Sequence, residues 1–371
     1  MPERKPGFDK PPAHLPSLHS WYAAHRRPLP WRATRDPYRI LVSEFLLQQT
    51  QVKQAIPYYK RFLARFPTVR SLASASQHDV LKLWEGAGYY ARARNLHKTA
   101  KIIVETYGGK IPPDYATLIS MPGIGPYLAA AVSSIAFGEQ RAVLDGNVIR
   151  VIARVNAVQQ AVDTPAAKKK LQKMADDWLS KSKVSPSAHN QAMMELGALV
   201  CTPRAPGCAH CPLQKDCAAF SHGAQEEFPV KNARPRRPVI AVATVLLVHK
   251  GKVLIAQRWG DDFLGGLWEF PGGKQEAGEA LSRTVAREFL EEVGLRVRPV
   301  REVMAVRAEY THKSVDMAVF LCRLEKQEKP SAPRAIDCQD VRWEKVSNLR
   351  RYAFPKANHA MIDWLEKNFG A

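Results

Sequence analysis

The 371-residue chain is longer than one compact domain usually is, and two or three domains are expected. Lys and Arg outnumber Asp and Glu by 55 to 35, and the net charge of +20 suits a polyanionic partner, nucleic acid first, although a generally basic surface would also account for it. No apolar run reaches the ~20 residues of a membrane span, we expect no secretory signal, and six cysteines in so long a chain exclude a disulfide framework.

The N-terminal part of the chain has a helical pattern. Residues 1–16 are rich in Pro and Lys and predict a poorly ordered start, and a helix is expected over residues 18–26. Asp36 followed by Pro37 is typical of a helix start, with an N-cap and then Pro at the first helical position. We expect the helix that begins there to continue to Val52.

Glu44 is an unusual residue on this predicted helix. Its neighbours three and four positions away are mostly apolar: Ile40, Leu41, Leu47 and Gln48. A carboxyl held in an apolar pocket has a raised pKa and can act as a general acid near neutral pH. Alternatively, Glu44 is a half-buried side chain that bonds to a backbone N–H or to an arginine.

Two glycines and an aromatic pair interrupt the helical pattern in the segment Trp84–Tyr90, and Arg92, Arg94 and Lys98 follow it. Aromatic side chains beside basic ones on a loop suit stacking or wedging into a nucleic acid. Core aromatics at a helix junction are the alternative.

Residues 118–131 predict a short helix, a tight Gly-Ile-Gly hairpin and the start of a second helix. Gly123 and Gly125 can take positive φ, and the amide N–H groups of such a turn form an anion site with the following helix N-terminus, so a phosphate is expected there. Twenty residues later, Asp145 occupies the N-cap position of a helix with a regular apolar stripe. A plain helix connector and an ordinary cap would give the same pattern.

Residues 165–200 predict two more helices, which lead into four closely spaced cysteines. Six, two and five residues separate them: Cys201, Cys208, Cys211 and Cys217. Thiolates at this spacing can surround one tetrahedral zinc ion or one iron–sulfur cluster, and both use the same soft ligands. The other two cysteines, Cys322 and Cys338, are expected to be reduced structural thiols.

Composition changes after a charged, Pro-containing linker at residues 231–238. Beyond it, an α/β domain of about 130 residues is expected. Its predicted strands are 239–248, 252–257, 317–324 and 341–346, with a hairpin at Lys250-Gly251. Helices are predicted over residues 280–293 and 356–368.

The first of these C-terminal helices carries three carboxylates on one face. Gly273 is followed after five residues by Glu279, and after seven more by Arg287 and Glu288. Glu288, Glu291 and Glu292 fall at positions i, i+3 and i+4 and together suit Mg²⁺ or Mn²⁺ and a diphosphate. A solvated acidic helix face is the alternative.

The first 230 residues resemble the helix-hairpin-helix DNA glycosylases of the endonuclease III superfamily, and within them the MutY-type adenine DNA glycosylases. The motifs that carry the resemblance are LPW (29–31), SEFLLQQTQV (43–52), WEGAGYY (84–90), MPGIGPY (121–127), LDGNV (144–148) and the cysteine spacing. The resemblance implies an all-α glycosylase with a [4Fe–4S] cluster in place of zinc. The domains it implies are an iron–sulfur-bearing region at 1–29 and 139–222, a helical barrel at 30–138, a linker at 223–238 and the C-terminal domain at 239–371.

The resemblance also assigns roles to residues. Glu44 would protonate a flipped adenine, and Asp145 would stabilise the sugar oxocarbenium ion, favoured in its ionised form by its cap position. Tyr127 and Asn147 would orient Asp145 and the attacking water. Because Tyr127 stands where bifunctional relatives have a lysine nucleophile, a monofunctional enzyme is implied. DNA and base contacts would come from Arg27, Leu29, Trp31, Gln49, Tyr89, Gly123 and Gly125.

The C-terminal domain resembles the MutT/Nudix fold. Its usual counterpart in this family has lost the catalytic signature, whereas the signature described above is complete here. Asn358 resembles the base-reading asparagine of MutT-type 8-oxo-dGTP hydrolases, because its amide offers both a donor and an acceptor. Thr311 and His312 partly match a loop that reads 8-oxoguanine in DNA.

The expected function is base excision repair. A monomer, cytoplasmic and nucleoid-associated in a bacterium, would bind duplex DNA with an A:8-oxoguanine or A:G mispair, hydrolyse the adenine glycosidic bond and leave an abasic site. Two alternatives come from other classes. One is a non-catalytic damaged-DNA binding module, and the other adds an 8-oxo-dGTP pyrophosphohydrolase activity in the Nudix domain.

Overall fold

A computed structural model describes residues 11–233, 237–260, 262–325 and 332–370. Most of the predicted irregular start, residues 1–10, lies outside the described residues. The chain forms two compact units, which are described separately. One comprises residues 1–73 and 98–234, and the other combines residues 74–97 with residues 235–371. No helix among the described residues is both long enough and apolar enough to cross a membrane.

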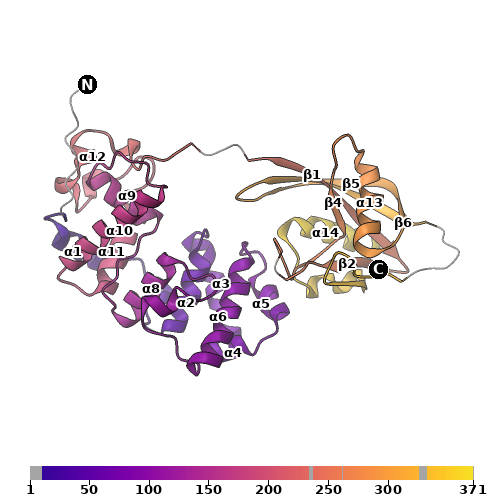
Figure 1. The fold of residues 1–371 in the computed structure, drawn as a ribbon, viewed down its shortest axis with the longest axis horizontal. Helices are drawn as coiled ribbons and strands as arrows, with labels where there is room; N and C mark the ends of the chain where they lie inside the picture. Colours follow the sequence, from indigo (N-terminus) through magenta and orange to yellow (C-terminus); the bar gives the residue numbers. More distant parts are fainter. Residues whose placement is uncertain (1–10, 234–236, 261, 326–331, 371) are drawn as a thin grey trace. The chain divides into compact units, whose positions relative to one another are not determined.

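The first unit is helical, and its helices form two groups (Figure 1). α2 packs against α3 and α8, while α11 packs against α1, α8, α9 and α10. The helices are α1 (Leu15–His25), α2 (Pro37–Leu47), α3 (Val52–Arg65), α4 (Val69–Ala73), the part of α6 (Ala91–Tyr107) from Lys98 onward, α7 (Tyr115–Leu118), α8 (Pro126–Phe137), α9 (Gly146–Val155), α10 (Pro165–Ser180), α11 (Pro186–Leu199) and α12 (Ala218–Ser221).

The predicted start of α2 is confirmed, but its predicted end at Val52 is wrong. The Asp36 carboxylate accepts a hydrogen bond from the backbone N–H of Tyr38, as an N-cap does. The helix ends at Leu47, and Gln49 takes a left-handed φ of 59° before α3 begins at Val52. The break leaves the Gln49 side chain exposed.

α7 and α8 are the two helices of the helix–hairpin–helix, and the hairpin joins them. Gly123 has the expected positive φ of 74°, whereas Gly125 does not: its φ is −87°, and it is the N-cap of α8. Pro126 follows at the first helical position, where a missing N–H costs nothing. One glycine therefore makes the turn, and the other lets α8 begin immediately after it.

The second unit is built on a mixed, seven-stranded sheet of described residues. Its path runs β3-β2-β1-β6-β5, with β4 on β1 and β7 on β2; β1 and β6 are parallel. Side chains alternate along β1, so that Ala243, Val245 and Leu247 pack under α13 while Leu246 packs under α14. The elements are β1 (Val239–His249), β2 (Lys252–Gln257), β3 (Trp268–Glu269), β4 (Gly272–Lys274), α13 (Leu281–Val293), β5 (Val297–Glu309), β6 (Ser314–Leu324), β7 (Asp340–Lys345) and α14 (His359–Phe369).

A short segment from the helical part of the sequence belongs to this second unit. It contains α5 (Gln77–Trp84) and the first turns of α6. The Lys82 ammonium donates to the Tyr352 carbonyl at 3.0 Å, and the Tyr90 hydroxyl donates to the Phe354 carbonyl at 3.1 Å. The carboxylate of Glu85 accepts the backbone N–H of Phe354 at 3.1 Å. The segment is thus held to the loop before α14 by hydrogen bonds.

Candidate active site and cysteine group

One cavity of about 540 Å³ in the helical unit brings together most of the residues predicted to act on the base. It lies among α2, α8, α9, α11 and the segment before α2. The predicted residues that line it are Arg27, Leu29, Trp31, Glu44, Tyr127, Asp145 and Asn147. Gln49, Gly123 and Gly125 do not line it.

Glu44 is the buried acid of this cavity, with 4% of its surface exposed. Burial raises the pKa of Glu44 to about 7, and the nearby Asp145 adds to the rise. The Tyr127 hydroxyl donates a hydrogen bond to Glu44 Oε2 at 2.6 Å and partly opposes it. The sequence left a pocketed and a half-buried Glu44 open; the structure shows it buried, with a tyrosine hydroxyl as its partner.

Asp145 caps α9, as predicted. Its Oδ1 accepts the backbone N–H of Val148 at 2.7 Å and its Oδ2 accepts the Asn147 side-chain amide at 2.8 Å. Burial raises the pKa of Asp145 and outweighs the hydrogen bonds of the cap, which lower the pKa and were expected to favour the ionised form. Both carboxyls of the cavity therefore have raised pKa values.

The two residues predicted to orient Asp145 have different partners. Asn147 contacts Asp145, whereas the Tyr127 hydroxyl contacts Glu44 and, at 3.6 Å, the sulfur of Met194. Arg150, which the sequence reasoning missed, donates to Asn147 Oδ1 at 2.9 Å and to the Cys201 carbonyl at 2.6 Å. A basic residue three positions after Asn147 on one helix face was the available signal.

Glu195 of α11 is a second carboxylate that the sequence reasoning missed. It is fully buried, and it receives hydrogen bonds from Arg27 at 2.9 and 2.6 Å and from Arg32 at 2.8 Å to each oxygen. Burial alone would raise its pKa, but the hydrogen bonds from Arg32 and Arg27 outweigh burial and lower the pKa to about 2. This paired acid fixes Arg27 in the cavity wall.

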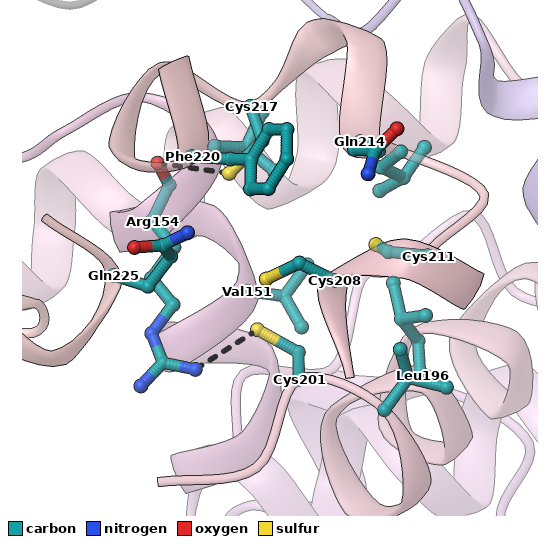
Figure 2. A pocket seen from close by; sticks show the side chains of 13 residues that line it. Val151, Arg154, Leu196, Cys201, Cys208, Cys211, Gln214, Cys217, Phe220 and Gln225 are labelled. Atoms are coloured by element: carbon teal, nitrogen blue, oxygen red, sulfur yellow. Dashed lines mark hydrogen bonds between the residues drawn. The ribbon is translucent and has the colours of Figure 1, made fainter. Parts of the chain in front are cut away.

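The four clustered cysteines line one small cavity, together with Val151, Leu196 and Phe220 (Figure 2). The Arg154 guanidinium donates to the Cys201 sulfur at 3.4 Å. Burial raises the pKa of Cys211 to about 12 and that of Cys217 to about 11, so these sulfurs keep their protons unless a cationic group replaces them. Within the described residues, no three metal-ligating side chains are close enough to share a single ion.

The predicted acidic face of α13 is organised by Arg287. Its guanidinium bonds to Glu279 at 3.0 Å, to Glu288 at 2.9 Å and to Glu291 at 3.2 Å. Glu292 accepts the Gly272 N–H at 3.0 Å, and burial, followed by the charges of Glu269 and Glu288, raises the pKa of Glu292 to about 8. Partly buried Glu269, bonded to Arg258 at 2.8 Å, is a neighbour that the sequence reasoning missed.

Tyr89 and the residues predicted to read 8-oxoguanine or a nucleotide base, Thr311, His312 and Asn358, fall in the second unit. The Tyr89 hydroxyl is 2.6 Å from the Thr311 hydroxyl, and Thr311 and His312 form the exposed tip of the β5–β6 hairpin. Asn358 is 6% exposed, and its amide donates to the Met361 sulfur at 3.8 Å. Tyr89 and Thr311 are therefore brought together, and Asn358 is turned into the core.

Two family models match the chain. The HhH-GPD superfamily base excision DNA repair protein model matches residues 42–177, and the NUDIX domain model matches residues 242–364. Human adenine DNA glycosylase is 34% identical, with 91% of this chain and 72% of the human protein covered. Adenine DNA glycosylase of Buchnera aphidicola subsp. Acyrthosiphon pisum is 32% identical, with 94% of this chain and 96% of that protein covered.

Among solved structures, a thermostable thymine-DNA glycosylase aligns with the helical part. Its TM-score is 0.52 and its identity 29%, covering 56% of this chain and 95% of that one. The matches over both parts of the chain agree with the fold class expected from the motifs. The chain is thus a DNA glycosylase of base excision repair with a Nudix domain, and it belongs to the adenine DNA glycosylase family.

Proposed function

We propose that the protein excises adenine mispaired with 8-oxoguanine, or with guanine, in duplex DNA and leaves the backbone uncut. One observation carries the proposal: Glu44 and Asp145 line the same cavity, and the pKa of Glu44 is close to neutral pH. The reaction needs an acid for the leaving base and a carboxylate for the sugar, and this pair offers both. We infer that the protein is a monomer and acts where the cell keeps its DNA, which in a bacterium is the cytoplasm.

Departure of the base is the first step. Adenine flipped into the cavity accepts the Glu44 proton on a ring nitrogen, so that the breaking glycosidic bond releases a neutral base. A general acid works best when its pKa lies near the working pH, and a pKa of about 7 meets that condition. The Tyr127 hydroxyl keeps the carboxyl pointed in one direction.

Stabilisation of the positive charge on the sugar is the second requirement. As the bond breaks, the sugar becomes an oxocarbenium ion, and the Asp145 carboxylate, held by Val148 and Asn147, faces it as a fixed anion. Water then adds its hydroxyl to the sugar, and its proton restores Glu44. Tyr127 carries a phenol and no amine, so it forms no Schiff base with the sugar and the backbone stays intact.

The direct test uses three duplexes that differ only in the base opposite adenine: 8-oxoguanine, guanine and thymine. We expect free adenine from the first two and none from the third, with strand cleavage only after alkali treatment. Binding to the 8-oxoguanine duplex without any release of adenine would instead favour the damaged-DNA binding module.

Replacing Tyr127 by Phe is expected to move the pH profile of excision. The hydrogen bond from Tyr127 stabilises the Glu44 carboxylate. Loss of this hydrogen bond should therefore raise the pKa of Glu44 from its value of about 7. The alkaline limb of single-turnover excision should shift upward by about one pH unit, the size of one hydrogen bond to a charged group. An unchanged limb would mean that another group sets it.

We propose that the four cysteines hold a [4Fe–4S] cluster. They surround one cavity, and their spacing of six, two and five residues is that of the iron–sulfur cluster in the glycosylase family that the chain resembles. The bound cluster would cross-link the loop after α11 by replacing the thiol protons.

Cys208→Ser should lower both bound iron and acid-labile sulfide and reduce the melting temperature. Cys322→Ala changes a buried cysteine of the Nudix core and should leave both contents unchanged. Metal analysis that finds zinc without sulfide in the native protein would contradict the cluster.

A second activity, hydrolysis of 8-oxo-dGTP, is favoured by how the two glycines of β4 meet the acidic face. Any side chain on Gly273 would overlap the Glu288 carboxylate, while Glu292 accepts the Gly272 N–H. Two carboxylates thus converge on the two glycines of β4, and their oxygens are the ligands that Mg²⁺ prefers. Their chemistry therefore suits the ion, and Arg287 pairs with Glu288 at 2.9 Å beside them.

We expect the full chain to convert 8-oxo-dGTP to the monophosphate with Mg²⁺ and to stop when the metal is chelated. Glu291→Gln and Glu292→Gln should each reduce turnover to background. Glu276→Gln removes an exposed carboxylate from the loop before α13 and should leave nucleotide turnover unchanged. Intact adenine excision without nucleotide turnover would leave the acidic face as a binding surface.

A further inference from the structure

The β5–β6 hairpin that carries Thr311 and His312 has a two-residue tip. The Tyr310 N–H donates to the Lys313 carbonyl at 2.9 Å, and both tip side chains are exposed. An exposed two-residue tip has few contacts of its own, so the position of its side chains depends on what packs beside it.

Phe263 supplies that packing. Its ring meets Tyr310 at 5.0 Å and 83° and His312 at 5.2 Å and 85°, both edge-to-face arrangements that aromatic pairs favour. The Lys313 ammonium lies over the same ring, 4.9 Å from its centroid. Three of the four residues of the turn therefore rest on one side chain, which is itself 43% exposed.

The loop that presents Phe263 is fixed at its backbone. Arg258 donates to the Phe263 carbonyl at 2.8 Å while it is paired with Glu269. Arg94, from the helical segment of the same unit, donates to the carbonyls of Gly265 at 2.8 Å and Asp262 at 3.1 Å. The backbone around the ring is thus held by hydrogen bonds, and the ring can act as a platform that positions a second loop.

We propose that Phe263 is a positioning residue for lesion recognition, because its ring holds the 310–313 turn where Thr311 meets Tyr89. The inference rests on the proposed function and adds a residue outside every motif that defines it. Tyr89 reaches Thr311 at 2.6 Å, so a turn displaced from the ring also loses this contact. Discrimination between an 8-oxoguanine and a guanine opposite adenine then depends on Phe263.

Phe263→Ala tests the proposal in the full chain. We expect the ratio of single-turnover excision rates, 8-oxoguanine duplex over guanine duplex, to fall about tenfold, as the loss of two aromatic pairs allows. The rate on the guanine duplex should stay within about twofold of wild type, since the cavity of Glu44 is untouched. Phe263→Tyr keeps the ring and should restore the ratio.

Trp259→Ala is the matched control, because Trp259 is an equally exposed aromatic of the same loop, at 47%. It should leave the ratio unchanged. An unaltered ratio in Phe263→Ala, or an equal loss on both duplexes, would overturn the role of Phe263 while wild-type discrimination still stands. A wild-type protein that releases no adenine from either duplex would overturn the proposed function itself.

Discussion

Replacing Glu44 by Gln is expected to lower single-turnover adenine release by about a thousandfold, within the range that a positioned general acid contributes. Gln has the shape of Glu but no acidic proton. It can still accept the Tyr127 hydroxyl, so the cavity keeps its packing and its hydrogen bond. The measurement is adenine released from an A:8-oxoguanine duplex with enzyme in excess, beside the dissociation constant for the same duplex.

The affinity for the duplex and the pH dependence of stability separate chemistry from folding. The dissociation constant should change little. Because the folded pKa of Glu44 is raised from 4.5 to about 7, its stabilising contribution is full below pH 4.5 and is lost as the pH rises through 7. Gln does not titrate, so between pH 4.5 and pH 7 the free energy of unfolding of the variant should rise relative to that of wild type. Substantial adenine release by the variant would show that Glu44 is not the general acid.

Local features of the site were predictable from the sequence because their causes lie within a few residues. Asp36 and Asp145 were both expected as caps, and each accepts the expected backbone N–H. The apolar neighbours of Glu44 made burial one of two interpretations, and the structure shows the side chain buried. Where α2 stops was not predictable, because helical residues continue past Leu47 and only the left-handed turn at Gln49 ends the helix.

Partners far apart in the chain escaped the sequence analysis. Glu195 pairs with Arg27 and Arg32 across more than 160 positions, and nothing in its local pattern predicts two guanidinium groups. β5 was also missed, because most of its side chains are exposed or partly exposed and its apolar alternation is weak. The platform at Phe263 depends on two loops of the folded unit and has no sequence signature.

Asp145→Asn is expected to reduce adenine release by about a hundred- to a thousandfold, the loss that removing one preorganised electrostatic group produces. Asn and Asp are equally good N-caps, so the start of α9 should survive the change. An amide carries no negative charge, and the oxocarbenium ion then forms without its counter-ion. Single-turnover excision and thermal unfolding, measured on the same preparation, separate these effects.

The hydrogen bonds around position 145 complicate the interpretation of Asp145→Asn. The Asn147 amide donates to Asp145 Oδ2, and Arg150 occupies the Asn147 oxygen, so an asparagine at 145 would set two donors against each other. Asp145→Ser keeps a capping oxygen and removes that conflict. If Asn and Ser lose activity alike while both keep their melting temperature, the missing charge is responsible. If Ser retains excision, the role of Asp145 reduces to capping α9, and the oxocarbenium ion must be stabilised by another group.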